Sequence, residues 1–516
     1  MRNPTLNPEE PNMSRLSKNI IYNLFGQGLL LVLGFVAVKF IFKRLGADAL
    51  GIIYFTATLN NIFCTVLEMG ICSTTVREVS THFKSDPGYI KDLVRTFSLF
   101  YWVFYALAGA AIFVLAPVLV EKWIILKSMD SATATHILRI LGIASLAALP
   151  KSFYASLFNG LQRMEFNNVI DVITAGLQQF GTILILTMGG NVFQVVYWYA
   201  ACYGFGVFAY LVVAGNLFPV KALIPGYAPG IVKRNFHFAS RMLFVSMTSA
   251  IHAQVDKVCI SKLLPVGVLG YYGFTYGVVS RGASLTSAIA QAVFPSFSAL
   301  FKSGDQAGLM RQYRKLQDLL CFASVPILAV VPFAMLPIFP LIFNEEIART
   351  LLLPATFLCL GFYMNATAAI PFIFSLAMGR PDIAARQHLY NFFVTVPVTI
   401  LLVYYMGIIG ASISMVFFYV FVYIYTIRRI CSECLGMPAW QWYLRVAKIY
   451  ALISVTYGTA WIILALSNAF SVASLFVAYL SASIAFIISA YFIISADLRE
   501  TLLLHLSRLQ RRSLDK

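Results

Sequence analysis

The sequence predicts an all-α membrane protein of about fourteen transmembrane helices, in which two parallel six-helix repeats form two lobes and two extra helices follow at the C-terminal end. Three observations predict this fold class. Hydrophobic residues make up 60% of the chain and charged residues 11%, with a mean hydropathy of +0.80, whereas soluble domains carry about a quarter charged residues. Long apolar runs follow one another along the chain, and one residue pattern occurs twice at a constant offset.

The apolar runs set the number of helices. A bilayer-spanning helix needs roughly 20 mostly apolar residues, and backbone in lipid must satisfy its own hydrogen bonds, so each run is predicted to be helical. The predicted spans are 20–42, 49–71, 96–120, 137–158, 169–188, 192–214, 241–263, 267–296, 319–343, 350–376, 388–406, 408–427, 446–467 and 472–494. Only Gly407 separates the two spans within 388–427.

The repeated pattern sets the relation between the lobes. Lys43, Leu45, Leu50, Gly51, Phe55 and Thr56 recur 219 positions later as Lys262, Leu264, Leu269, Gly270, Phe274 and Thr275, and Phe153, Ser156, Leu157 and Gly160 recur as Phe372, Ser375, Leu376 and Gly379. One period contains six predicted spans. Because six is even, both repeats enter the membrane in the same direction, and an axis along the membrane normal should relate them. Internal repeats of this kind are typical of transporters.

The repeat also divides the chain into parts. We expect an N-terminal tail at 1–19, an N-lobe at 20–215, a linker at 216–240, a C-lobe at 241–428, two extra helices at 446–494 and a C-terminal tail at 495–516. Pro219, Pro225 and Pro229 should make the linker irregular. Its basic residues suit an amphipathic segment on the cytoplasmic surface.

The net charge of +17 follows the predicted topology. With the N-terminus in the cytoplasm, most Lys and Arg residues fall in the tails and in the even-numbered connections, which predicts that both termini are cytoplasmic. The basicity therefore indicates membrane orientation, and no nucleic-acid partner is expected. The first apolar run is too long for the hydrophobic part of a signal peptide and should remain as an anchor.

Several kinds of site are not expected. No connection is long enough to hold a soluble domain, and no GxxxxGK[ST] phosphate loop occurs, so ATP hydrolysis is not predicted. Cys431 and Cys434 form an isolated CxxC pair without two further ligands nearby, so neither a metal nor another cofactor is predicted.

Ionisable residues inside predicted spans are the main functional candidates, because a charge in the bilayer is costly. Arg281 lies midway along 267–296; its alternative role is a structural ion pair. Lys39 and Lys257 occupy nearly equivalent repeat positions, where both could also extend to the membrane surface. Lys151 follows Pro150, and a proline kink that opens onto a cavity would suit it.

A polar stripe follows the predicted helix 241–263. Ser246, Ser249, His252 and Asp256 are three or four residues apart and share one helix face. They could line a cavity, and a polar packing seam is an equally supported reading. A cavity lined by the four cations Lys39, Lys151, Lys257 and Arg281, with Asp256 as the only carboxylate, would be positive and would favour a phosphate or pyrophosphate.

Several short segments are distributed over nearly the whole chain. They are Asn23-Leu-Phe-Gly, Arg44–Tyr54, Glu68-Met-Gly with Arg77-Glu78, Gly160–Asn168, and Asp256-Lys257 before Leu269-Gly-Tyr-Tyr. Together they resemble the polysaccharide transporter family of lipid-linked oligosaccharide flippases, to which bacterial O-antigen flippases belong. The family is part of a superfamily that also contains multidrug exporters and lipid II flippases.

The resemblance implies a function at the bacterial cytoplasmic membrane. The protein would move a polyprenyl-diphosphate-linked oligosaccharide between leaflets for O-antigen or related surface polysaccharide, with alternating rocking of the lobes. The prenyl tail would stay among membrane lipids. H⁺ or Na⁺ is a candidate coupling ion, with Asp256 or His252 as its binding group, and polysaccharide polymerase and chain-length machinery are candidate protein partners.

Three alternatives remain at this point. A multidrug/cation antiporter would need buried carboxylates, of which Asp256 is the only deep example. A lipid II flippase would differ in substrate more than in mechanism. A membrane glycosyltransferase or polymerase would need long catalytic loops outside the membrane, and the predicted connections are short, so we expect a transporter and not an enzyme.

Overall fold

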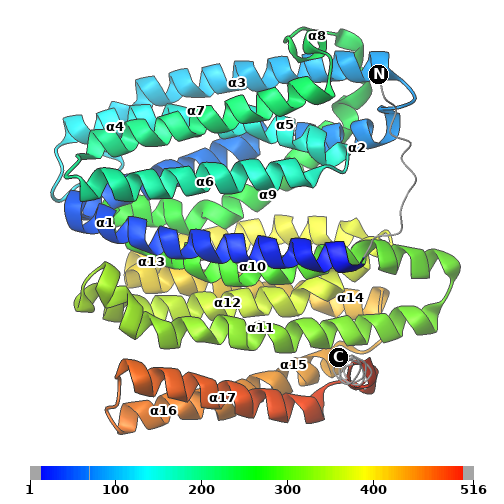
Figure 1. Ribbon diagram of the computed structural model, residues 1–516. Coiled ribbons are helices and arrows are strands. Elements are labelled where there is room, and N and C mark those ends of the chain that lie inside the picture. The colour runs from blue at the N-terminus through cyan, green and yellow to red at the C-terminus, as the bar shows by residue number, and fades with distance from the viewer. Residues whose placement is uncertain (1–12, 69, 502, 504–516) are drawn as a thin grey trace, which may run out of the picture. The chain divides into compact units, whose positions relative to one another are not determined.

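The computed structural model describes residues 13–68, 70–501 and 503 (Figure 1), and within these ranges the side chains of 13–27 and of parts of 237–250 and 284–295 are not described. Parts of the predicted tails therefore lie outside the described residues. The described chain consists of helices joined by short non-helical segments and contains no β-strand, which confirms the predicted fold class.

The helices follow the predicted spans closely. Their bounds are α1 Met13–Leu67, α2 Ile71–His82, α3 Pro87–Lys122, α4 Ser131–Ser145, α5 Ala148–Gly160, α6 Met164–Thr187, α7 Val192–Leu217, α8 Val220–Leu223, α9 Pro229–Leu263, α10 Val266–Ser303, α11 Gln306–Ile342, α12 Glu345–Ala377, α13 Pro381–Phe421, the π-helix η1 Val422–Ile427, α14 Arg428–Glu433, α15 Ala439–Ile453, the π-helix η2 Ser454–Gly458, α16 Thr459–Leu466 and α17 Val472–Ile493. Within the described residues, nine helical runs are long and apolar enough to cross a membrane.

Two glycines divide helices that contain two predicted spans each. Gly407 interrupts α13 with φ 58° and ψ −133°, as the sequence predicts. Gly46 interrupts α1 with φ 87° and ψ 175°. Because a positive φ is accessible to glycine without the steric cost of a Cβ atom, each glycine changes the chain direction without a loop.

Two prolines lie at helix positions that differ from those predicted. Pro229 begins α9, so 229–240 is helical, and the earlier part of the predicted irregular linker also contains the short helix α8. A proline at the first helical position is favourable because its missing N–H needs no partner there. Pro150 lies in the first turn of α5, after a break at Leu146 and Ala147.

The described chain forms two compact units. Among the described residues, the first contains 13–49, 67–68, 70–117 and 132–243, and the second contains 50–66, 118–131, 244–501 and 503. The second half of α1 and the segment 118–131, which the repeat assigns to the first lobe, are thus part of the second unit.

A short helix that the sequence analysis did not predict organises the first unit. Glu78 of α2 is only 5% exposed. Its carboxylate accepts hydrogen bonds from Arg77 at 2.6 Å and from the Tyr89 hydroxyl of α3 at 2.9 Å. Asn235 of α9 donates to the same Tyr89 hydroxyl at 3.0 Å. One buried carboxylate therefore ties α2 and α3 together, and Tyr89 extends the network to the beginning of α9.

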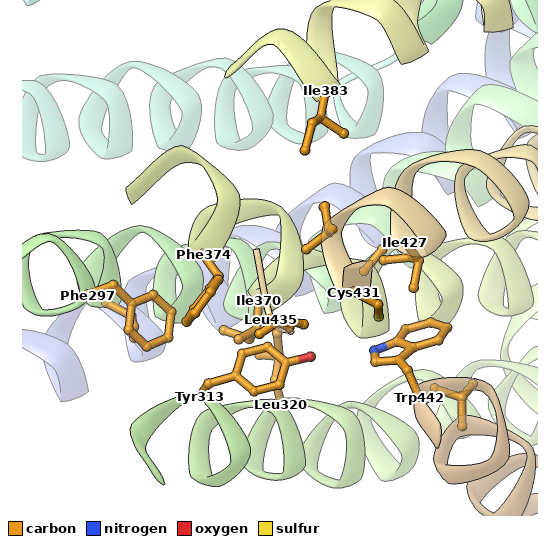
Figure 2. Close-up of a cluster of buried hydrophobic side chains, with 14 of the residues drawn as sticks. Phe297, Tyr313, Leu320, Ile370, Phe374, Ile383, Ile427, Cys431, Leu435 and Trp442 are labelled. Atoms are coloured by element: carbon orange, nitrogen blue, oxygen red, sulfur yellow. The ribbon is translucent and has the colours of Figure 1, made fainter. Parts of the chain in front are cut away.

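The second unit has a large aromatic and aliphatic core (Figure 2). Phe374 of α12 packs edge-to-face against Phe297 of α10 and Tyr313 of α11, with ring centroids 5.4 and 5.3 Å apart. Ile427 of η1 and Trp442 of α15 belong to the same cluster. This core fixes the end of η1, which also contributes to the cavity described below.

Within the second unit, a buried carboxylate on α11 holds the last helices in place. Asp318 of α11 is 1% exposed. It accepts two hydrogen bonds from the Arg445 guanidinium of α15 and one, at 2.8 Å, from the backbone N–H of Ser495. Tyr479 of α17 donates to the backbone carbonyl of Pro326 in α11 at 3.1 Å. These contacts place α15 and α17 against α11.

The two copies of the repeated Leu-Gly pattern pack against each other inside the second unit. A Cβ atom on Gly51 would lie 2.1 Å from the carbonyl oxygen of Val266, and one on Gly270 would lie 2.9 Å from Leu50 Cγ. Val266 also donates its N–H to the Ile125 carbonyl at 2.9 Å. Small residues permit this close helix approach.

Gly51→Ala is therefore expected to destabilise the protein, whereas Gly28→Ala on the same helix should not, because a Cβ atom on Gly28 would meet nothing within 4 Å. Overpacking of this kind costs about 1–3 kcal/mol. The check is the thermal unfolding temperature of the two purified full-length variants in detergent. Equal unfolding temperatures would show that the contact between Gly51 and Val266 is not tight.

Candidate functional site

An ion pair is buried between α9 and α10 in the second unit. Lys257 Nζ lies 3.2 Å from Asp256 Oδ1, and the two side chains are 10% and 12% exposed. The Tyr272 hydroxyl donates to Asp256 Oδ2 at 2.7 Å. Lys257 also donates to the Ala253 carbonyl at 3.1 Å, and its ammonium lies 3.7 Å from the ring centroid of Tyr276.

Consecutive helix residues do not normally face each other, so this pair depends on the reach of the lysine side chain. The ammonium turns back toward α9 and meets both the neighbouring carboxylate and a backbone carbonyl. The charge of Asp256 is therefore balanced within the chain, and its carboxylate accepts bonds from two side chains.

A cavity of about 500 Å³ lies beside this pair, a size usual for small-molecule sites. Its walls come from α9, α10, α12, α13 and η1. His252 and Asp256 of α9 both line it, and the His252 ring contacts Phe418 of α13 in a tilted arrangement, with centroids 3.9 Å apart. Tyr276 and Tyr419 add further aromatic surface.

One face of α13 supplies a buried polar stripe to this region. Gln387, Asn391, Thr395 and Thr399 follow one another at intervals of four residues, and none is more than 4% exposed. Residues at this spacing share a helix face. Thr395 donates to the Asn391 side chain, and Thr399 donates to the backbone carbonyl of Thr395 at 2.8 Å. Gln387, Thr395 and Thr399 line the cavity.

The sequence analysis missed this stripe. Its signal was present, because four polar residues at i+4 intervals occur within and just before the predicted span 388–406.

The predicted cationic residues occupy different environments. Lys151 lies in the first unit, where it pairs with Asp171 at 2.8 Å, and the Tyr210 hydroxyl donates to the same carboxylate at 3.0 Å. Lys39 is a half-buried residue of α1 in the first unit. Arg281 is an exposed residue of α10 in the second unit. None of these three, nor Lys257, is among the residues that line the cavity.

The predicted polar stripe of α9 is described only in part. His252 and Asp256 face the same cavity, and the side chains of Ser246 and Ser249 lie outside the described residues. The walls of the cavity are polar and aromatic. They differ from the positive surface that the sequence predicts for a phosphate site.

Solved membrane transporters share this fold. A structure described as lipid II flippase MurJ in an inward closed conformation matches 92% of this chain and 98% of its own, with a TM-score of 0.68 and 14% identity. An inward-facing multidrug resistance MATE family transporter of the MOP superfamily matches 78% of this chain and 95% of its own, with a TM-score of 0.64 and 12% identity. Such similarities concern the fold alone.

Sequence comparison gives the family. A Shigella flexneri protein described as "Putative O-antigen transporter" is 20% identical over 406 residues, which is 77% of this chain and 93% of that protein. The sequence pattern that defines the polysaccharide biosynthesis protein family matches residues 16–301. Because this match covers more than half of the chain, the protein belongs to the polysaccharide biosynthesis protein family.

Proposed function

We propose that this protein moves a polyprenyl-diphosphate-linked oligosaccharide from the inner to the outer leaflet of the bacterial cytoplasmic membrane, for the synthesis of a cell-surface polysaccharide such as O-antigen. The observation that carries the proposal is the family match over residues 16–301. The Shigella flexneri relative and the helical transporter fold agree with it.

The physical problem is the polar head group. A glycan and a diphosphate cannot cross hydrocarbon without a polar path, whereas the prenyl tail can remain among the membrane lipids. Alternating access exposes such a path to one side at a time. In the proposed topology both termini are cytoplasmic, and polymerase and chain-length machinery act after the head group has crossed.

Arg281 is the leading candidate for the phosphate contact. Lys151 and Lys257 pair with Asp171 and Asp256, at 2.8 and 3.2 Å, and a lysine ammonium offers a phosphate no bidentate contact. Arg281 is an exposed residue within the predicted span 267–296. A guanidinium binds phosphate oxygens in a bidentate manner. Lys39 is the second candidate, from the first unit.

The multidrug/cation antiporter is less well supported. An organic cation needs an available carboxylate, and Asp256 already accepts hydrogen bonds from Lys257 and Tyr272. A lipid II flippase remains an alternative of closely related chemistry, because its substrate is also a glycan on a polyprenyl diphosphate.

Arg281→Ala is expected to abolish glycan transfer, since the head group loses its counter-charge, while the protein still inserts into the membrane. The check is surface glycan in a strain that carries the variant as its only copy. Lys302→Ala is the matched control, because Lys302 is an exposed cation at the end of the same helix. Normal surface glycan in the Arg281 variant would remove this residue from the transport path.

Asp256 and His252 are the proposed groups for coupling to H⁺ or Na⁺. Asp256→Asn alone leaves Lys257 buried without its partner, at a cost of about 3–5 kcal/mol, so the informative variant combines Asp256→Asn with Lys257→Met. We expect the double variant to recover the thermal stability that the single variant loses, and to lose the response of transport to an imposed ion or pH gradient. The measurement is glycolipid transfer in proteoliposomes.

His252→Gln should be measured in the same assay to separate the two candidate groups. A double variant that responds to both gradients as the wild type does would exclude Asp256 from coupling. Asp256 would then act only as the partner of Lys257 in a structural ion pair.

A further inference from the structure

Two buried polar groups face the cavity without a partner among the described residues. They are the side-chain amide nitrogen of Gln387, on α13, and the hydroxyl of Thr426, in η1. The two residues are 4% and 2% exposed. A buried polar group without a hydrogen bond costs free energy, so nearly all such groups in proteins are satisfied. Their position in the cavity wall indicates that a bound molecule satisfies them.

The local backbone supports the same interpretation. Thr426 belongs to the π-helix Val422–Ile427. π-helical turns are rare and occur frequently at functional sites. Val422 and Ile427 of this turn also line the cavity, and both belong to the second-unit core, in which Figure 2 labels Ile427. The irregular turn is therefore firmly packed on one side and open to the cavity on the other.

The charge of the walls limits the chemistry of the ligand. Neither Lys nor Arg is among the lining residues, and the basic groups there are the histidines His252 and His388, so the walls offer a phosphate no permanent counter-charge. Asp256, the only lining carboxylate, already pairs with Lys257, so a cation would have to displace an internal partner. A prenyl tail would leave Gln387 and Thr426 unsatisfied.

The remaining class is an uncharged molecule that combines hydroxyl or amide groups with apolar faces. Tyr276, Phe418 and Tyr419 provide aromatic surface on which the C–H face of a sugar ring can lie. Gln387 and Thr426 provide hydrogen bonds to ring substituents. A mainly apolar wall with a small number of polar groups at fixed positions is typical of a specific small-molecule site.

We propose that this cavity in the second unit binds one sugar ring of the glycan head group, with Gln387 donating to an oxygen of the sugar and Thr426 exchanging a hydrogen bond with a hydroxyl. The inference rests on the proposed function and assigns recognition of the glycan to this cavity, separately from the diphosphate. The cavity then helps to select the glycan by its sugar, whereas Arg281 binds the diphosphate, which all such substrates share.

The experiment compares two kinds of probe on the full-length purified protein. One is farnesyl diphosphate, and the other is farnesyl diphosphate that carries a single glucose, galactose or N-acetylglucosamine residue. The variants are Gln387→Met and Thr426→Val, which keep the side-chain shape and remove the unpaired polar group. Gln441→Met and Thr350→Val make the same exchanges at exposed positions outside the cavity.

Each cavity variant should bind the best glycosylated probe about three- to tenfold more weakly, as expected for the loss of one hydrogen bond, and should bind farnesyl diphosphate as the wild type does. Each should also unfold at the same or a higher temperature without ligand, because an unsatisfied group has been removed. A residue with a purely structural role would instead lower that temperature.

Two results would overturn the inference in distinguishable ways. If the wild type prefers a glycosylated probe and both cavity variants retain that preference, the sugar binds elsewhere and the proposed function stands. If the wild type binds no glycosylated probe better than farnesyl diphosphate, the proposed function itself fails together with the sugar site.

Discussion

Polar groups inside an apolar helical protein must find their partners within the chain, and this constraint explains most of the second unit. Asp256 is satisfied by Lys257 and Tyr272, and Asp318 by Arg445 and the Ser495 amide. Each carboxylate fixes the relation between two or more helices, because unpairing a buried charge is far more costly than losing an exposed ion pair. The unsatisfied groups of Gln387 and Thr426 are informative for the same reason.

The constraint also separates two kinds of recognition. A diphosphate requires cations, and neither Lys nor Arg lines the cavity of the second unit. A glycan requires hydrogen-bonding groups and flat apolar surface, which the cavity between α9, α12 and α13 provides. A substrate that contains both a diphosphate and a glycan can therefore be held by two different types of surface.

The sequence contained enough to predict the helices, because length and apolarity decide whether a segment can cross a bilayer. It also indicated the break at Gly407. It did not reveal α2, whose residues are too polar to resemble a span, or the helical start of α9 at Pro229. The Asp256–Lys257 pair escaped prediction because adjacent residues on a helix usually diverge, and only the folded structure shows the lysine turning back. The polar stripe of α13 was visible in the spacing of Gln387, Asn391, Thr395 and Thr399, yet spacing alone could not show that α12 and η1 close a cavity around it.

The attachment of the last helices has a consequence for how the chain can be shortened. The six-span repeat ends before α15, so α15 to α17 look like an appendage that could be trimmed to a twelve-helix core. Asp318, however, lies in α11, within the repeat, and its three hydrogen-bond donors all come from the later segment. A truncated protein would carry a bare carboxylate inside its own core, so the C-terminal pair is an integral part of the second repeat's architecture.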